Sequence, residues 1–267
     1  MTTVAGLVPY LGGALALGGV AVAATRRREL MIRWCVWALG VPLVTAAFWL
    51  GPPGIAVLVA VVGVVAVAEY CGLLQLGPVD RAVLAAAVVG LVLTAWLAPA
   101  EVLRVAAAGA LAIAGVPLFS GDAEHGLRRL GAGLLGLVWL GALAGLVSSG
   151  ALGLVLFVAV SIADIVAYAA GRRIGGPRFS RLSPAKRWSG TLAGAAAGLL
   201  TLAVLSSLTW QTAVAVAVGG PLGDLLESMV KRGAGAKDAG RWLPGSGGIL
   251  DRIDSLLVAL AVLLVLN

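Results

Sequence analysis

Ten long apolar stretches, separated by glycine, proline or charged residues, constrain this chain more than any other feature of its sequence. A helix that crosses the hydrocarbon core of a bilayer needs about 20 apolar residues. Because 61% of the 267 residues are hydrophobic and only 12% are charged, too little charge is left to cover a water-soluble surface. We therefore predict an all-α, polytopic bundle of integral membrane helices, with about nine or ten transmembrane helices. The stretches are 5–24, 34–50, 54–76, 82–98, 102–119, 130–147, 151–171, 190–208, 211–227 and 254–267.

The basic residues are distributed unequally among the connections between these stretches. When the connections are assigned alternately to the two sides of a membrane, one side collects all of the 19 Lys and Arg residues except Arg104. Basic loops of membrane proteins face the cytoplasm. We therefore expect a multi-pass protein of the cell membrane, with its basic loops in the cytoplasm and both ends of the chain outside. The same bias explains the net charge of +7 without a nucleic-acid partner. The first stretch has no basic segment before it, which favours a retained helix over a cleaved signal peptide.

Histidine and cysteine are nearly absent. The only histidine is His125, which excludes a His-rich zinc site and a Ser-His-Asp triad built on nearby histidines. Cys35 and Cys71 lie in or beside apolar stretches and form neither a metal-binding nor a disulfide pattern. Any chemistry must therefore use carboxylates, hydroxyls, cations and a metal ion.

The first half of the chain is composed almost entirely of Ala, Val, Leu and Gly, whose small members suit close helix contacts. We expect residues 1–150 to form a lipid-facing and dimer-forming scaffold. Its exception is Glu69, deep in the third stretch. An acid inside a membrane is costly enough to be a functional hypothesis, and the alternative is that it faces an interfacial cation such as Arg81.

The second half, residues 151–267, differs in kind, because acids interrupt its helices and basic loops follow them. Asp164 interrupts the seventh stretch, and Asp224 with Glu227 interrupts the ninth. The acids and the basic loops converge on one side of the predicted bundle. We therefore expect this half to form the catalytic region with its cytoplasmic loops.

The loop at residues 171–190 is suited to a polyanion. It carries six cations, including Lys186 and Arg187, together with four glycines. Lys and Arg balance phosphate charge, and glycine allows backbone amides to approach a phosphate. An equal alternative is a basic loop that contacts lipid head groups.

The loop after the ninth stretch carries the acids of a predicted metal site. On a helix, Asp224 and Ser228 share a face at spacing i,i+4, as do Asp251 and Asp254 at i,i+3. Two such pairs facing each other offer oxygen ligands for Mg²⁺, which takes its ligands from carboxylates, water and substrate phosphates. The alternative is that the acids of the second pair only cap the last helix. In the metal-site hypothesis, three cations hold a triphosphate and a glycine-rich stretch closes over it: Lys231, Arg232, Lys237 and 245–248.

These motifs resemble the phosphatidate cytidylyltransferase (CDP-diacylglycerol synthase) family of membrane enzymes. The family pattern runs from Ser-x-apolar-Lys-Arg through Lys-Asp and Pro-Gly-His-Gly-Gly to Asp-Arg-apolar-Asp, and the resemblance covers roughly the last 105 residues of the chain. In register with this pattern are Ser228, Lys231, Arg232, Lys237, Asp238, Pro244, Gly245, Gly247, Gly248, Asp251, Arg252 and Asp254. Upstream, the similar positions are 164–168, Gly171, Gly175, 183–186 and Gly190.

The chain departs from the family pattern at two places. Ser246 stands where the family usually has His, and 187–190 reads Arg-Trp-Ser-Gly where the family usually has Thr-Trp-Glu-Gly. Neither departure removes a metal carboxylate. Both change groups that are expected near the phosphates, and therefore bear on substrate choice and efficiency.

The resemblance implies that the protein transfers CMP from CTP to phosphatidic acid. It also implies a homodimer. It implies Asp224, Asp251 and Asp254 as ligands of Mg²⁺, with a second cation left open, and Ser228 and Lys237 as further catalytic residues. The implied substrate-binding residues are Asp164, Lys186, Arg187, Lys231, Arg232, Asp238, Gly245, Ser246, Gly247, Gly248 and Arg252.

Two other functions stay open at the level of the sequence. The first is the same chemistry on a different membrane lipid phosphate, because the apolar first half does not distinguish lipid chains. The second is a transporter or a catalytically inactive relative, whose acids would line an ion path. Acids spread along several helices would favour the transporter, whereas here they cluster with glycines and cations on one side.

Overall fold

The structure is a computed structural model that describes residues 3–25, 27–236, 238–240 and 247–267. Within these residues the chain is helical, without a β-strand, as the sequence predicts. The elements are α1 (Val4–Thr25), α2 (Arg28–Trp49), α3 (Pro52–Leu73), α4 (Pro78–Leu97), η1 (Pro99–Glu101), α5 (Val102–Phe119), α6 (Gly126–Gly141), α7 (Ala144–Ser149), α8 (Ala151–Ile174), α9 (Trp188–Val204), α10 (Trp210–Val214), η2 (Ala215–Gly219), α11 (Gly220–Gly233) and α12 (Leu250–Leu266).

Every predicted apolar stretch is found as helix. Among the described residues, eight spans are long and apolar enough to cross a membrane, which confirms the prediction of a polytopic helical bundle. α9 and α12 have 17 residues each, and at 1.5 Å per residue they are about 25 Å long. The sixth stretch is divided into α6 and α7, and the ninth contains η2, a π-helical segment between α10 and α11.

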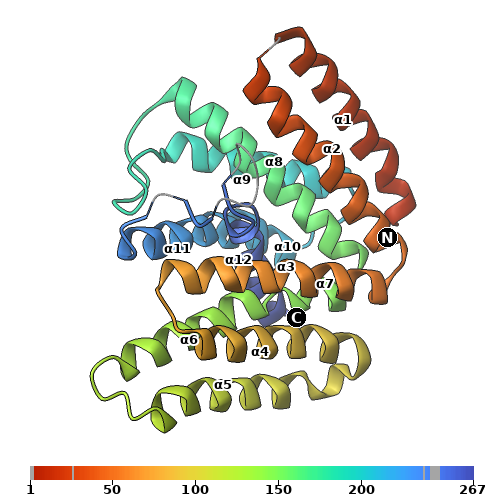
Figure 1. Cartoon of the computed structure of the whole chain (residues 1–267). Helices are drawn as coiled ribbons and strands as arrows, with labels where there is room; N and C mark the ends of the chain where they lie inside the picture. Colours follow the sequence, from red (N-terminus) through yellow and green to blue (C-terminus); the bar gives the residue numbers. More distant parts are fainter. Residues whose placement is uncertain (1–2, 26, 237, 241–246) are drawn as a thin grey trace.

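The helix α12 lies at the centre of the molecule (Figure 1). It packs against α3, α6, α7 and α8 as well as against α10 and α11. Leu250, Leu257 and Leu260 on this helix are fully buried, and one continuous apolar core includes residues of α3, α4, α6, α8 and α12. The hairpin of α1 and α2 lies at the periphery, and Leu7 is the only residue of α1 that is buried.

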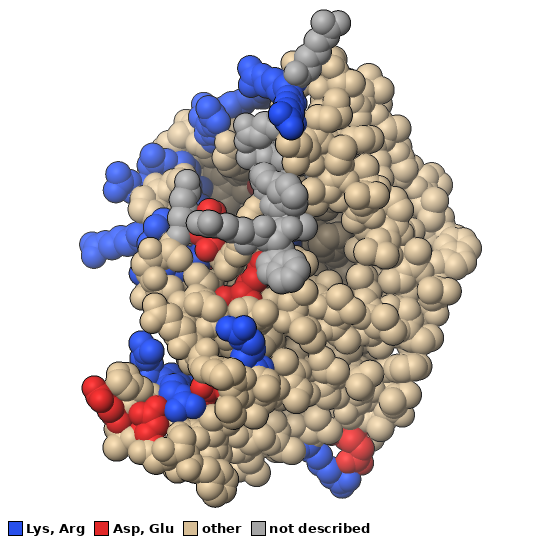
Figure 2. All heavy atoms as spheres, viewed as in Figure 1, with Lys and Arg blue, Asp and Glu red and all other residues tan. Residues whose placement is uncertain are grey.

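The charged side chains gather on one side of the molecule. Figure 2 shows Lys and Arg side chains along the left of the face in view, with acidic side chains among them near the centre. The right half of that face is almost entirely composed of other residue types. The basic side includes the α8–α9 loop and the end of α11, where the sequence places its basic segments.

Candidate active site

Two glycines bring the continuous segment of η2 and α11 against α12. A Cβ atom added to Gly219 would lie 2.8 Å from the Cα of Ala259, and one added to Gly223 would lie 2.7 Å from the Cα of Ser255. Glycines four residues apart allow two helix backbones to approach closely. Because Asp224 follows Gly223 directly and Asp254 precedes Ser255, this contact brings their carboxylates to one place.

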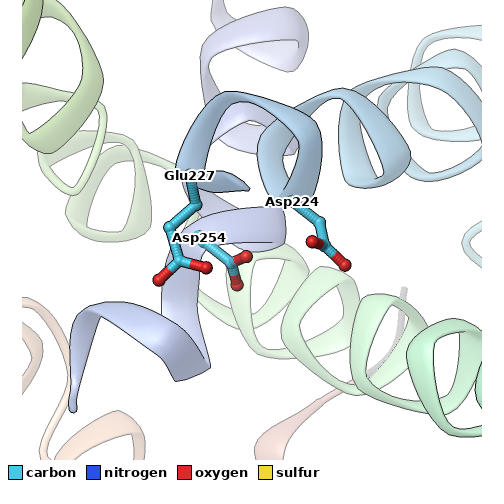
Figure 3. Close-up of side chains that lie close together, drawn as sticks. All are labelled: Asp224, Glu227 and Asp254. Carbon is cyan, nitrogen blue, oxygen red and sulfur yellow. The ribbon is translucent and has the colours of Figure 1, made fainter. Parts of the chain in front are cut away.

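Three carboxylates meet at this crossing: those of Asp224 and Glu227 from α11 and that of Asp254 from α12. One oxygen from each lies within 4.8 Å of the others. Figure 3 shows the three side chains pointing to the same side of the crossing, with Asp254 between the other two. Glu227 and Asp254 are buried, whereas Asp224 is partly exposed.

Lysines form ion pairs with two of these acids, Asp224 and Glu227. Lys186, from the α8–α9 loop, forms an ion pair with Asp224. Lys231 forms an ion pair with Glu227 one helical turn away, and its Nζ atom also lies 2.9 Å from Oδ1 of Asp251. Two charges taken out of water are stable together only where they are paired. The two lysines therefore balance the charge of Asp224, Glu227 and Asp251.

Asp251 lies outside the group of three. Its carboxylate accepts hydrogen bonds from the backbone N–H of Gly248 (2.7 Å) and of Ala239 (3.1 Å), besides its contact with Lys231. It thereby holds the turn that precedes α12. A glycine is required in this turn at Gly247, where φ is +81° and a Cβ would lie 2.8 Å from Oδ2 of Asp251.

A cavity of about 790 Å³ lies beside the acids and is lined by α8, α9, α11 and the loops that follow α8 and α11. Ser228, one turn after Asp224, is on its wall with its Oγ 3.5 Å from Oδ1 of Asp224. The predicted site residues on this wall are Asp164, Lys186, Arg187, Asp224, Ser228, Lys231, Arg232 and Asp238. Gly247, Gly248, Asp251, Arg252 and Asp254 are described elsewhere around the α12 turn, and Lys237, Gly245 and Ser246 lie outside the described residues.

The α8–α9 loop is held so that Lys186 reaches the cavity. Gly171 of α8 and Gly190 of α9 face each other, and a Cβ on Gly190 would lie 3.1 Å from the Cα of Gly171. The backbone N–H of Phe179 donates to the carbonyl of Lys186 at 2.9 Å, and the ring of Phe179 meets that of Trp188 edge to face.

Arg187 and Ser189, the departures from the family pattern that lie among the described residues, both hold this same loop. Arg187 donates from Nη1 to the carbonyl of Gly176 at 3.2 Å, and the Ser189 hydroxyl donates to the carbonyl of Gly175. The residues that stand in place of Thr and Glu therefore close the base of the loop, and Arg187 also reaches the cavity wall.

Two acids contribute to this region that the motif alone did not include. Glu227 joins the group of three, and its i,i+3 spacing from Asp224 was the available signal. Glu69, on α3, lies against the start of α12 and not in the cavity wall. No local pattern in the sequence connects Glu69 to residues so distant along the chain.

The donor set suits a hard divalent cation. Carboxylate oxygens are the ligands that Mg²⁺ takes from proteins, and Oε1 of the buried Glu227 side chain has no hydrogen-bond partner among the described residues. A buried, unpartnered carboxylate oxygen is costly. This oxygen, beside two other carboxylates, is where a cation would compensate that cost.

The chain is similar to known proteins over most of its length. A family model described as the cytidylyltransferase family matches residues 31–267. The chain belongs to the cytidylyltransferase family. The prediction from the motif is thus confirmed, and the match extends well beyond the last 105 residues that carried it.

Individual relatives of this family member are similar over a part of their length. The chain is 46% identical over 117 residues to the phosphatidate cytidylyltransferase of Brucella abortus (strain 2308), which is 40% of this chain and 43% of the relative. It is 39% identical over 156 residues to the phosphatidate cytidylyltransferase of Pseudomonas aeruginosa, covering 51% of this chain and 55% of the relative. It is 39% identical over 114 residues to the chloroplastic phosphatidate cytidylyltransferase 4 of Arabidopsis thaliana, covering 39% and 29%. The chain thus matches about half or less of the length of these relatives.

Proposed function

We propose that the chain transfers CMP from CTP to phosphatidic acid, which gives pyrophosphate and leaves CDP-diacylglycerol in the membrane. The observation that carries this proposal is the meeting of Asp224, Glu227 and Asp254 with Lys186 and Lys231 beside one cavity. It is supported by membership of the cytidylyltransferase family and by relatives named phosphatidate cytidylyltransferase.

In this reaction a phosphate oxygen of phosphatidic acid forms a bond to the α-phosphorus of CTP. The bond from that phosphorus to the bridging oxygen breaks, and pyrophosphate leaves with the electron pair. A phosphate monoester has a second pKa of about 6 and is mostly a dianion at pH 7. The nucleophile therefore needs no strong base, and catalysis consists mainly of positioning and charge neutralisation.

We assign the metal site to the acids of the α11–α12 crossing. Mg²⁺ held there would supply positive charge that stabilises the charge developing on the phosphates. Asp224, Asp254 and Glu227 offer the converging oxygens. Asp251 remains a candidate ligand, because Lys231 links it to Glu227, and a second cation remains part of the proposal.

The cations on the cavity wall are assigned to the phosphates. Lys186 and Lys231 now contact carboxylates, and each would be free to bind a phosphate once another cation neutralises those acids. Arg187 and Arg232 line the same wall. The remaining proposed substrate contacts are Asp164, Asp238, Gly247, Gly248 and Arg252, with Lys237, Gly245 and Ser246 proposed from the motif alone.

We also propose how the protein is placed. CTP is a cytoplasmic substrate, so the basic side seen in Figure 2 would face the cytoplasm and the protein would lie in the cell membrane. Residues 151–267 would carry the catalysis, and 1–150 would form the scaffold of a homodimer.

The test is pyrophosphate release from the detergent-purified protein with CTP, Mg²⁺ and phosphatidic acid, omitting each in turn and following the lipid product. Release that needs all three and yields CDP-diacylglycerol is the expected result. Activity only with another lipid phosphate would reassign the substrate. The departures from the family pattern, at Ser246 and in 187–190, would then be the first candidates for that specificity. Silence with every lipid phosphate would contradict the proposal and favour an inactive relative or a transporter.

A further inference from the structure

Glu69 connects the scaffold half to the start of α12. Its side chain is 5% exposed, and its two oxygens accept hydrogen bonds from the backbone N–H of Ile249 (3.1 Å) and of Leu250 (2.7 Å). These groups are 180 and 181 positions from Glu69 along the chain. The first N–H groups of a helix have no partner within the helix, and the residue at the N-cap of α12, Ile249, has no side chain that could accept them. Glu69 therefore caps α12 from another helix.

The turn before α12 is built closely around this carboxylate. A Cβ added to Gly248 would lie 2.6 Å from both oxygens of Glu69, and one added to Gly240 would also meet the carboxylate. On the other side of the turn, Asp251 accepts from the N–H groups of Gly248 and Ala239. The turn is thus held between two carboxylates, one from α3 and one from α12 itself.

We propose that Glu69 is a positioning residue of the proposed reaction, which fixes the N-terminal turn of α12 and thereby the placement of Asp251 and Asp254 at the metal site. A carboxylate inside an apolar helix is costly unless it is hydrogen-bonded. Two amide donors and the positive end of the α12 dipole offset that cost here. Glu69 does not line the cavity, so it acts on the acids through the turn and not on the substrate.

The experiment compares two variants that disturb this contact from opposite sides with a control on the same helix. Glu69→Gln keeps the shape, but its amide offers one acceptor oxygen and turns an N–H₂ toward the other backbone donor. Gly240→Ala leaves the carboxylate unchanged and pushes against it with a Cβ. The control is Tyr70→Phe, at the next residue of α3. It removes the part-buried hydrogen bond of 2.7 Å that the Tyr70 hydroxyl donates to the carbonyl of Ala132 on α6.

Two readouts do not depend on activity. The first is hydrogen exchange of the Ile249 and Leu250 amides by mass spectrometry, which reports local opening of the turn. The second is the Mg²⁺ concentration that gives half of the Mg²⁺-induced rise in Tm. Loss of a residue that orients metal ligands typically costs about 10- to 100-fold in metal affinity or activity, so we expect at least a tenfold rise in that concentration. Both variants should exchange faster at these two amides. The Tyr70→Phe control should change neither the exchange nor the Mg²⁺ concentration, although its Tm should fall slightly.

In turnover, the proposal predicts a fall in kcat with little change in KM for CTP, because Glu69 touches no substrate. The double variant Glu69→Gln/Gly240→Ala should be no worse than the worse single variant, since both changes break the same contact.

Unchanged amide exchange together with unchanged Mg²⁺ dependence in Glu69→Gln would overturn the proposal, and so would the same losses in Tyr70→Phe. If Glu69→Gln does not fold, Gly240→Ala decides by the same readouts. If the parent protein releases no pyrophosphate with any lipid phosphate, the proposed reaction fails, whereas exchange and Mg²⁺-induced stabilisation still test Glu69.

Discussion

At the scale of single residues, the site balances buried acids against lysines. Glu227 is 2% exposed and its partner Lys231 is 15% exposed, whereas Asp224 and its partner Lys186 are 29% and 27% exposed. The desolvation of an unpaired charge rises steeply with burial. The ion pair of Lys231 is therefore more buried than that of Lys186, and we expect it to matter more for stability.

Removal of an acid from the cluster should strongly lower metal-dependent turnover. Because residues that merely orient metal ligands already cost about 10- to 100-fold, we expect Asp224→Asn and Glu227→Gln each to lower kcat by about 100-fold or more. The measurement is pyrophosphate release as a function of Mg²⁺ concentration. The control is Glu101→Gln, which removes an acid paired with Arg104 at another end of the bundle. Full turnover in either cluster variant would show that its carboxylate is not a metal ligand.

Removal of a lysine should destabilise the protein according to the burial of its partner. Breaking a buried pair by removing one partner costs about 3 kcal/mol or more, and we expect this loss for Lys231→Met in EDTA. Lys186→Met breaks a more exposed pair and should cost about 1 kcal/mol or less. Thermal unfolding in detergent, with EDTA and then with Mg²⁺, measures both. Mg²⁺ should restore more stability to Lys231→Met than to Lys186→Met, and equal losses without restoration would refute this account.

At the scale of the elements, the site depends on the close approach of α11 and α12. The backbone of Gly223 meets the backbone at Asp254 and Ser255, so these helices touch where the acids branch from them. The π-helical segment η2 comes directly before α11. Such segments are frequent at functional sites, and η2 ends at Gly219, five residues before Asp224.

A methyl group at Gly223 should therefore separate the two helices. Overpacking a tight contact typically costs about 1–3 kcal/mol, and we expect Gly223→Ala to lose this stability together with most of its Mg²⁺-induced rise in Tm. The matched control is Gly220→Ala on the same helix, where a Cβ would meet nothing within 4 Å. The control should be neutral or should gain up to about 1 kcal/mol from helix propensity. A Gly223→Ala protein that is as stable as the control would mean that the helices can repack around the added methyl group.

The sequence predicts the elements well and their contacts poorly. The ten apolar stretches follow from hydropathy, because each helix must be apolar by itself to cross a membrane. The acids of α11 and α12 follow from i,i+3 and i,i+4 spacing, but this spacing leaves open which acid of a pair faces the partner helix. Asp251 was expected with Asp224 and Asp254, whereas the group of three contains Glu227. The contact of Glu69 with Ile249 has no local signal, since only the packing of the whole bundle brings α3 to α12.

At the scale of the whole molecule, charge divides the bundle into two ends. The α8–α9 loop and the end of α11 carry the cations, whereas the connection through η1 carries Arg104 with its partner Glu101. The division agrees with the positive-inside rule.

Cysteine labelling tests the orientation that this division predicts. After the exposed Cys35 is replaced by serine, single cysteines at Arg181 and Ala100 place one probe on each end, and both of these positions are exposed. A membrane-impermeant maleimide added to intact spheroplasts should label Ala100→Cys, and should label Arg181→Cys only after lysis. The reverse pattern would place the basic loops outside and would remove the access of the site to cytoplasmic CTP.

The central position of α12 sets the order in which the protein can mature. The ribosome completes this helix after α1 to α11, although it fills the middle of the bundle and supplies Asp254 to the site. α3 therefore carries the acceptor for the α12 amides before those amides are made. Until α12 is inserted, the acidic group lacks Asp254, and Glu69 lacks the two backbone amides that donate to it.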